Sequence, residues 1–333
     1  MKTPHESVES TLPRTETAHQ SPSAMLSTVD RLARPGVPTL DAILGHPFRV
    51  LDDGFIRLLD YMGNDAAVVQ AARISYGTGT KRVHEDKNLI RYLMRHSHTT
   101  PFEMCEIKFH VRVPMDTWRQ WIRHRTANVN EYSTRYSLAI DAAQRTAPDQ
   151  WRTQSSVNRQ GSGDRIPEPT GQALSSAEQN IQKKMRQVYQ DRISAGVARE
   201  QARKDLPLST YTEAYWKIDL HNLLHFLRLR MDEHAQNEIR SYATVIGTEI
   251  MPKWVPIIWE AFLDYQIDAI QLSRTELDIV HALIANDPQR ATAIAAQRNL
   301  LKRRSDGNLT RNRERTELDV KLRLLGLTPP WCQ

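Results

Sequence analysis

The chain has 333 residues, of which 40% are hydrophobic and 25% charged, a composition ordinary for a soluble globular protein of one large domain or two modest ones. It has no run of about 18 apolar residues and no basic-then-apolar N-terminal order, which argues against a membrane span and a secretory signal, so we expect a cytoplasmic protein. The net charge of +6 is concentrated between Arg298 and Arg315, where seven basic residues accompany two acids.

The N-terminal segment is rich in Ser, Thr, Pro and Glu and has few bulky apolar residues. Such a segment cannot bury enough apolar surface to offset the entropy lost on ordering. We therefore expect residues 1–42 to form a disordered leader, followed by one folded domain over residues 43–270.

The first half of that domain alternates short strands and helices. A strand and turn are expected from Phe48, a helix from Asp65 to about Ser75, and another over residues 85–97. The clearest strand runs from Glu106 to Val113, where apolar and polar residues alternate strictly, so that one face is buried.

After Pro114 a helix is expected to lead into an arginine-rich segment. Residues 141–171 lose periodicity and indicate a long surface loop. Helices are expected over residues 175–205 and in three stretches between 220 and 265, with a short strand at 211–216 between them. The pattern predicts an α+β fold with a mixed or antiparallel sheet flanked by helices.

From residue 271 to 333 the composition shifts toward Ala, Arg and Asn, which indicates an accessory, basic C-terminal extension. A helical tail that packs on a neighbouring subunit and a disordered tail both fit. For its basic stretch we favour a solvated surface over a nucleic-acid contact.

The segment from Arg119 to Tyr136 concentrates four arginines among hydroxyl and amide side chains. Because the guanidinium group presents a planar fork of donors, this segment predicts an anion site suited to a phosphoester. A solvated basic helix end is the alternative. Trp118 and Trp121 are expected in the core rather than stacked on a ligand.

The same segment resembles the signature of the flavin-dependent thymidylate synthases. Arg123-His124-Arg125 is followed after seven residues by Ser133, and Asn130-Glu131 and Arg135-Tyr136 also match. The resemblance extends over roughly residues 48–262, through ARISY, MRHSHTTPFE, LPLSTYTEAYW and LRLRMDEHAQNEI. It implies conversion of dUMP to dTMP, with FAD as cofactor and NADPH and methylenetetrahydrofolate as co-substrates.

The resemblance implies two sets of binding residues. The flavin side comprises Ser75, His98, Thr100, Glu103, Arg123, His124, Arg125, Glu131, Asp219, His221, His225 and His234. The nucleotide side comprises Gln120, Arg123, Glu131, Ser133, Thr134, Arg135, Arg203 and Arg230. Arg230 has the catalytic role, because a guanidinium beside the pyrimidine favours the N3-deprotonated uracil, whose C5 can then accept a one-carbon unit.

The resemblance further implies a homotetramer whose active sites combine residues from several subunits, and no metal. Neither Cys105 nor Cys332 lies in a nucleophile motif, so we expect no covalent attack by a thiol. No Ser-His-Asp pattern surrounds Ser133, so we expect its hydroxyl to bind a ligand rather than to act as a nucleophile.

Two other functions remain as alternatives. A metal-dependent phosphohydrolase could draw ligands from His98, His124, His221, His225, His234, Glu103, Glu131 and Asp232, but no acid-flanked metal motif accompanies them. A nucleic-acid-binding module could use the basic C-terminal stretch, and this would not exclude catalysis.

Overall fold

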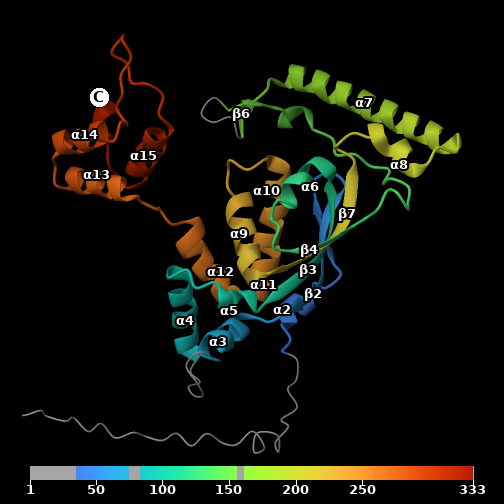
Figure 1. Cartoon of the computed structure of the whole chain (residues 1–333), viewed down its shortest axis with the longest axis horizontal. Coiled ribbons are helices and arrows are strands. Elements are labelled where there is room, and N and C mark those ends of the chain that lie inside the picture. The colour runs from blue at the N-terminus through green and yellow to red at the C-terminus, as the bar shows by residue number, and fades with distance from the viewer. Residues whose placement is uncertain (1–34, 75–82, 156–160, 333) are drawn as a thin grey trace, which may run out of the picture. The chain divides into compact units, whose positions relative to one another are not determined.

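A five-stranded antiparallel sheet forms the centre of the fold in the computed structural model, which describes residues 35–74, 83–155 and 161–332 (Figure 1). The strand order is β1-β2-β3-β7-β4. The strands are β1 (Pro47–Val50), β2 (Gly54–Met62), β3 (Glu106–Pro114), β7 (Tyr211–Asp219) and β4 (Asn128–Glu131). The expected α+β fold with helices flanking a sheet is confirmed.

The alternating pattern of β3 places one of its faces in the core. Ile107, Phe109, Val111 and Val113 are all buried, as expected. Phe109 stacks on Trp216 of β7 with ring centroids 5.9 Å apart, and Trp121 meets Trp216 edge-on at 5.1 Å. Each such buried aromatic side chain contributes roughly 1.5–3 kcal/mol of hydrophobic stabilisation.

Helices cover the buried face of the sheet. Those around the sheet are α3 (Asp65–Arg73), α4 (Val83–Arg95), α5 (Thr100–Glu103), α6 (Met115–Trp121), α9 (Leu220–Arg230), α10 (Asn237–Val245), α11 (Met251–Trp254) and α12 (Pro256–Phe262). Two π-helical turns, Ile246–Ile250 and Leu263–Ile267, extend α10 and α12. The helices from α6 onward supply most of the aromatic and aliphatic partners of β3 and β7.

Asp65 is the first residue of α3, where a helix was expected to begin, but it does not cap that helix. Asn64 caps that helix, because its side chain accepts from the backbone N–H of Ala67. The Asp65 carboxylate instead accepts from the backbone N–H groups of Ile257 and Ile258 at 3.1 and 3.0 Å, and so caps α12. Burial raises the pKa of Asp65, and the two backbone donors oppose this shift.

The expected leader ends earlier than residue 42. Residues 1–34 lie outside the described part of the chain, but Pro38–Asp41 forms the short helix α2 with Leu40 fully buried. The Tyr61 hydroxyl donates to the Asp41 carboxylate at 2.6 Å. Residues 35–42 therefore belong to the ordered part of the protein.

The segment expected to be a long loop contains regular structure. It holds a 3-10 turn (Pro148–Gln150) and a two-stranded sheet of β5 (Arg152–Gln154) and β6 (Ser162–Arg165). Helix α7 begins already at Glu168 and runs to Ser194. Gly196, with a φ of 77°, turns the chain toward α8 (Arg199–Ala202) and the 3-10 turn Arg203–Asp205.

The C-terminal extension contains three helices with a hydrophobic core of their own. They are α13 (Arg274–Ile284), α14 (Pro288–Gln297) and α15 (Arg313–Leu324), followed by a 3-10 turn at Pro330–Cys332. Their core consists of Ile279, Val280, Ala282, Ala291, Ala295, Leu300, Leu318, Leu322 and Trp331. Of the two expected alternatives, the helical one describes this segment. None of the described helices is long and apolar enough to cross a membrane.

Candidate functional site

A half-buried pair of side chains, Arg230 and His124, lies at the centre of the candidate site. Helix α6 ends at Trp121, which brings His124 against the last turn of α9, where Arg230 lies. Arg230 Nε donates to His124 Nε2 at 3.0 Å. Burial lowers the pKa of His124 to about 4, and the charges of Arg230 and His225 add to the effect. The imidazole is therefore neutral at pH 7 and can accept this hydrogen bond.

Gln120 joins this pair through its backbone and its side chain. Its carbonyl oxygen accepts from Arg230 Nη2 at 3.5 Å, and its side-chain amide donates to Gln236, which precedes α10. Gln120, Arg230, Gln236 and His234 line one cavity. His234 is exposed there and Nδ1 of its ring lies 3.0 Å from the Asp232 carboxylate.

A second cavity, of about 170 Å³, brings together three of the predicted flavin-side histidines. His98 follows α4, whereas His221 and His225 lie one turn apart on α9. The His225 and His124 ring centroids are 5.9 Å apart, so the cavity adjoins the Arg230–His124 pair. Its other lining residues are Leu93, Met94, Ser97, Thr99, Phe102, Leu224, Arg228, Phe262 and Gln266.

Glu131 lies on the exposed edge strand β4, and two buried side chains hold its carboxylate. One carboxylate oxygen accepts from Trp118 Nε1 at 3.0 Å and the other from the Thr212 hydroxyl at 2.9 Å. The carboxylate thus fixes the edge strand β4 to α6 and β7. Trp118 is buried, as expected.

The segment after β4 carries the predicted nucleotide-binding residues and contacts the end of the α7–α8 region. The Arg203 guanidinium donates to the Thr134 hydroxyl. Arg135 Nε lies 3.1 Å from the Glu200 carboxylate, an exposed ion pair, and the Ser133 hydroxyl accepts from the Arg135 backbone N–H at 3.3 Å. Ser133, Thr134, Arg135 and Arg203 therefore lie together within one chain.

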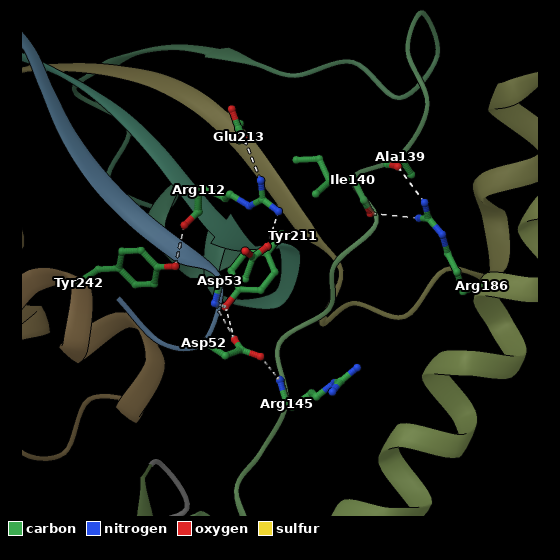
Figure 2. A network of polar contacts seen from close by, with 10 residues as sticks. All are labelled: Asp52, Asp53, Arg112, Ala139, Ile140, Arg145, Arg186, Tyr211, Glu213 and Tyr242. Atoms are coloured by element: carbon green, nitrogen blue, oxygen red, sulfur yellow. Dashed lines mark hydrogen bonds and ion pairs between the residues drawn. The ribbon is translucent and has the colours of Figure 1, made fainter. Parts of the chain in front are cut away.

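Helix α7 clamps the continuation of this segment at residues 139–141 (Figure 2). Arg186 donates to the carbonyl oxygens of Ile140 at 3.0 Å and Ala139 at 3.2 Å, and pairs with Asp141 at 2.8 Å. The Tyr189 hydroxyl accepts from the Ala139 backbone N–H at 2.9 Å. The guanidinium group thus donates hydrogen bonds to two successive backbone carbonyl oxygens of a segment that lies in no strand.

A further polar network ties the same segment to the β1–β2 turn (Figure 2). Asp52 accepts from the Tyr211 hydroxyl at 2.5 Å and from the Arg145 backbone N–H at 3.0 Å. Tyr242 donates to the Arg112 carbonyl at 2.7 Å, close to Gly54. A Cβ atom at Gly54 would lie 2.0 Å from the Tyr242 hydroxyl oxygen, so this position requires glycine.

Several predicted site residues lie apart from these clusters or cannot be placed. Ser75 lies outside the described residues. Asp219 caps α9 by accepting from the Asn222 backbone N–H, which is a structural role. The side chains of Thr100, Glu103, Arg123 and Arg125 are exposed. Glu103 lies at the end of α5, and Arg123 and Arg125 flank His124.

Comparison with known proteins decides the family. The model of the family described as "Thymidylate synthase complementing protein" matches residues 57–257. The flavin-dependent thymidylate synthase of Wolbachia pipientis wMel is 53% identical over 75% of this chain and 88% of its own length. That of Gluconobacter oxydans strain 621H is 52% identical over 77% and 85%. This chain belongs to the flavin-dependent thymidylate synthase family.

A solved structure also resembles this chain. The UMP/dUMP methylase PolB from Streptomyces cacaoi, bound with 5-Br dUMP, superposes with a TM-score of 0.60 at 31% identity. The similarity covers 66% of this chain and 98% of that one. The family model ends at residue 257, before the C-terminal helices begin. Among the described residues, no group of three or more His, Cys, Asp or Glu is arranged to hold a metal ion.

The structure adds residues to the site of this family member that the sequence did not single out. Gln236 holds Gln120, Thr212 and Trp118 hold Glu131, and Arg186 with Tyr189 holds residues 139–141. All of them act across long sequence separations. Only the three-dimensional arrangement reveals them, because each is an ordinary residue of a helix, strand or cap in the local sequence.

Proposed function

We propose that this chain converts dUMP to dTMP and that Arg230, oriented by neutral His124, activates the pyrimidine. The Arg230–His124 hydrogen bond carries the proposal, since it joins the Arg-His-Arg motif to the arginine to which the resemblance gives the catalytic role. Family membership supports the reaction, and the dUMP analogue bound to the Streptomyces cacaoi methylase supports the substrate class.

The cavity lined by three histidines suits part of a flavin. Its walls are apolar at Leu224, Phe262 and Phe102, while imidazoles and the Arg228 guanidinium supply donors at its rim. This combination fits an aromatic ring that carries polar edges and an anionic tail. A volume of about 170 Å³ is below the usual range for a whole ligand, so the remainder of FAD would be held elsewhere, with His124 and Arg125 among the contacts.

When bound and reduced by NADPH, FAD supplies the hydride that completes the methyl group. Methylenetetrahydrofolate is the proposed carbon donor. For its part, Arg230 places a positive charge beside the pyrimidine and favours the N3-deprotonated form of uracil, which enriches C5 in electrons. Burial lowers the pKa of Arg230, but a guanidinium starts so far above neutrality that it stays charged at pH 7.

The buried thiol of Cys105 is not suited to act as a nucleophile in this chemistry. Cys105 is buried in contact with the Asn64 carbonyl, and burial raises the pKa of its thiol to about 12. The thiolate is the reactive form of cysteine, and at pH 7 almost none would exist here. Electrostatic activation by Arg230 therefore replaces covalent attack.

The nucleotide and the cofactor are proposed to meet between subunits of a homotetramer. The cluster of Arg135 with Glu200 and Thr134 with Arg203 shares no residue with the Arg230 cluster. A second copy could bring its Arg135 and Arg203 to the Arg230 of the first, which would complete a site for one nucleotide.

The test is a dTMP assay with dUMP, methylenetetrahydrofolate, NADPH and FAD. We expect wild type to be yellow and active, and Arg230→Ala to lose roughly 10²- to 10³-fold in kcat, the usual effect of removing one preorganised donor. Arg230→Lys should recover part of the rate, because it keeps the charge but not the fork.

Two results would contradict the proposal. A folded, FAD-loaded wild type that forms no dTMP would reject the function. Activity of Arg230→Ala within threefold of wild type would reject only the role of Arg230.

A further inference from the structure

The basic stretch of the C-terminal extension forms a small β-ribbon between α14 and α15. Arg303 and Leu309 make an antiparallel bridge, Arg304 N–H donates to the Asn308 carbonyl at 2.8 Å, and Thr310 N–H donates to the Lys302 carbonyl at 2.7 Å. Gly307, with a φ of 81°, makes the turn. The stretch is therefore neither a loose tail nor one face of a helix, the two forms in which a run of charges is usually only solvated.

The ribbon presents six exposed cations. We call residues 298–313 the basic ribbon, and its exposed cations are Arg298, Lys302, Arg303, Arg304, Arg311 and Arg313. Asp306 is its one acid, and its carboxylate already accepts from the Asn308 backbone N–H at the turn. Five of the six cations are arginines, which bind phosphate oxygens in a bidentate manner better than lysine does.

The helices anchor the basic ribbon at both ends. Arg315 Nη1 donates to the Leu300 carbonyl at 3.1 Å, and Asn312 caps α15 by accepting from the Arg315 backbone N–H at 3.0 Å. Leu300 and Leu318 are buried in the core of the C-terminal helices. The cations are thus displayed on an ordered support, which reduces the conformational entropy lost on binding a polyanion.

We propose that the basic ribbon binds the phosphate backbone of double-stranded nucleic acid. The ribbon contains no aromatic residue, and single-strand binding relies on aromatic side chains that stack on bases. The exposed large apolar residues of the extension, Leu277, Ile284, Val320, Leu324 and Leu325, lie outside the ribbon, so no apolar wedge accompanies its cations into a bilayer. The family model ends at residue 257, so this activity goes beyond the synthesis of dTMP.

The test uses the full-length protein and a fluorescent 20-base-pair duplex, with DNA and RNA in separate arms. Binding is measured by anisotropy from 50 to 300 mM salt. If four to six phosphates are neutralised, the logarithm of the DNA binding constant should fall with that of the salt concentration with a slope of about −4 to −5. Binding of either duplex supports the proposal, and the two arms decide between DNA and RNA.

The variant K302Q/R304Q/R313Q removes three exposed cations from the ribbon. Its matched control, R274Q/R290Q/R323Q, removes three exposed arginines from the same helical extension outside the ribbon. We expect the ribbon variant to bind at least about tenfold more weakly at 100 mM salt, with a slope shallower by about 2 to 3, and the control to bind within twofold of wild type. Thermal melting and dTMP synthesis should be unchanged in both.

Three results would overturn the proposal. The first is no duplex binding at 50 mM salt. The second is equal weakening by the two triple variants, which would make net charge alone responsible. The third is binding to vesicles of anionic phospholipid without binding to either duplex.

Discussion

His124 owes its chemistry to its surroundings rather than to its place in the Arg-His-Arg motif. The motif predicted a residue beside the flavin. The structure shows a half-buried imidazole between Arg230 and His225, with its ring edge-on to Phe226 at 4.9 Å. Charged neighbours and a low local dielectric both disfavour the imidazolium form.

This environment makes stability fall in mildly acidic solution. Unfolded His124 takes up a proton near pH 6.5, whereas the folded pKa is about 4, so between these values the unfolded state binds more protons. The free energy of unfolding therefore decreases as the pH falls below about 6.5. This loss of stability is absent above pH 7. We expect His124→Asn to lose less Tm between pH 7 and pH 5 than wild type does. His46→Asn, a change at an exposed histidine, is the control and should behave as wild type does.

Sequence reasoning identified residues that form a local motif, whereas their distant partners appear only in the structure. Thr134, beside Ser133 and Arg135, accepts a hydrogen bond from Arg203, which is far away in the sequence. Asp65 is a residue type that often begins a helix, yet its carboxylate caps α12 rather than its own helix. Glu131 was predicted to face ligands, and both its oxygens accept hydrogen bonds from within the protein. A one-dimensional pattern cannot report such partners.

At the scale of elements, β3, α9 and most of α7 followed directly from periodicity, whereas the structure of residues 141–171 did not. The Gln, Ser, Gly and Asp content of that segment indicates a loop, but α7 already begins at Glu168 and has tertiary contacts that composition does not encode. Only a few of its residues are buried, among them Tyr189 and Ser175. Its stability thus depends on specific contacts to residues 139–146 rather than on a broad apolar face.

The clamp by α7 should matter for nucleotide binding. Arg186→Met keeps much of the side-chain length but removes the donors to Ala139 and Ile140. We expect the KM for dUMP to rise about tenfold, with kcat and the KM for methylenetetrahydrofolate within threefold of wild type, because residues 133–135 lose their fixed position. Hydrogen exchange should increase at residues 133–141.

Gln187→Met, one position away on the same helix, serves as the control and should leave both measurements unchanged. A fall in kcat together with a general loss of exchange protection would show that Arg186 only supports folding.

At the scale of the whole molecule, the C-terminal helices show that composition alone did not decide between a folded and a disordered extension. The Ala- and Arg-rich extension left a helical and a disordered form open, and buried side chains such as Leu318 and Trp331 favour the folded one. The oligomeric state depends on contacts between copies of the chain, which composition does not encode. The proposed homotetramer is therefore tested through its function.

Mixing two inactive variants tests for shared sites. If Arg230 and Arg203 of one active site come from different subunits, Arg230→Ala and Arg203→Ala each abolish activity alone. After dissociation and reassembly together, mixed tetramers contain some sites with both arginines intact. We expect recovery of up to roughly a quarter of wild-type activity. No recovery in a sample that light scattering shows to be mixed tetramers would place both arginines in the same subunit.

The cap that Asp65 provides for α12 has a consequence for how the protein is made. Residue 65 must meet residues 257 and 258, and Trp254 donates to the Gly63 carbonyl at 2.9 Å. The contact between α3 and α12 forms only after α12 has been synthesised. On the ribosome, Asp65 must therefore wait for nearly two hundred further residues before its partners Ile257 and Ile258 emerge, although β2 and α3 can pack earlier on β3, α4 and α5. The C-terminal helices are synthesised after that contact becomes possible and can fold on their own core without delaying it.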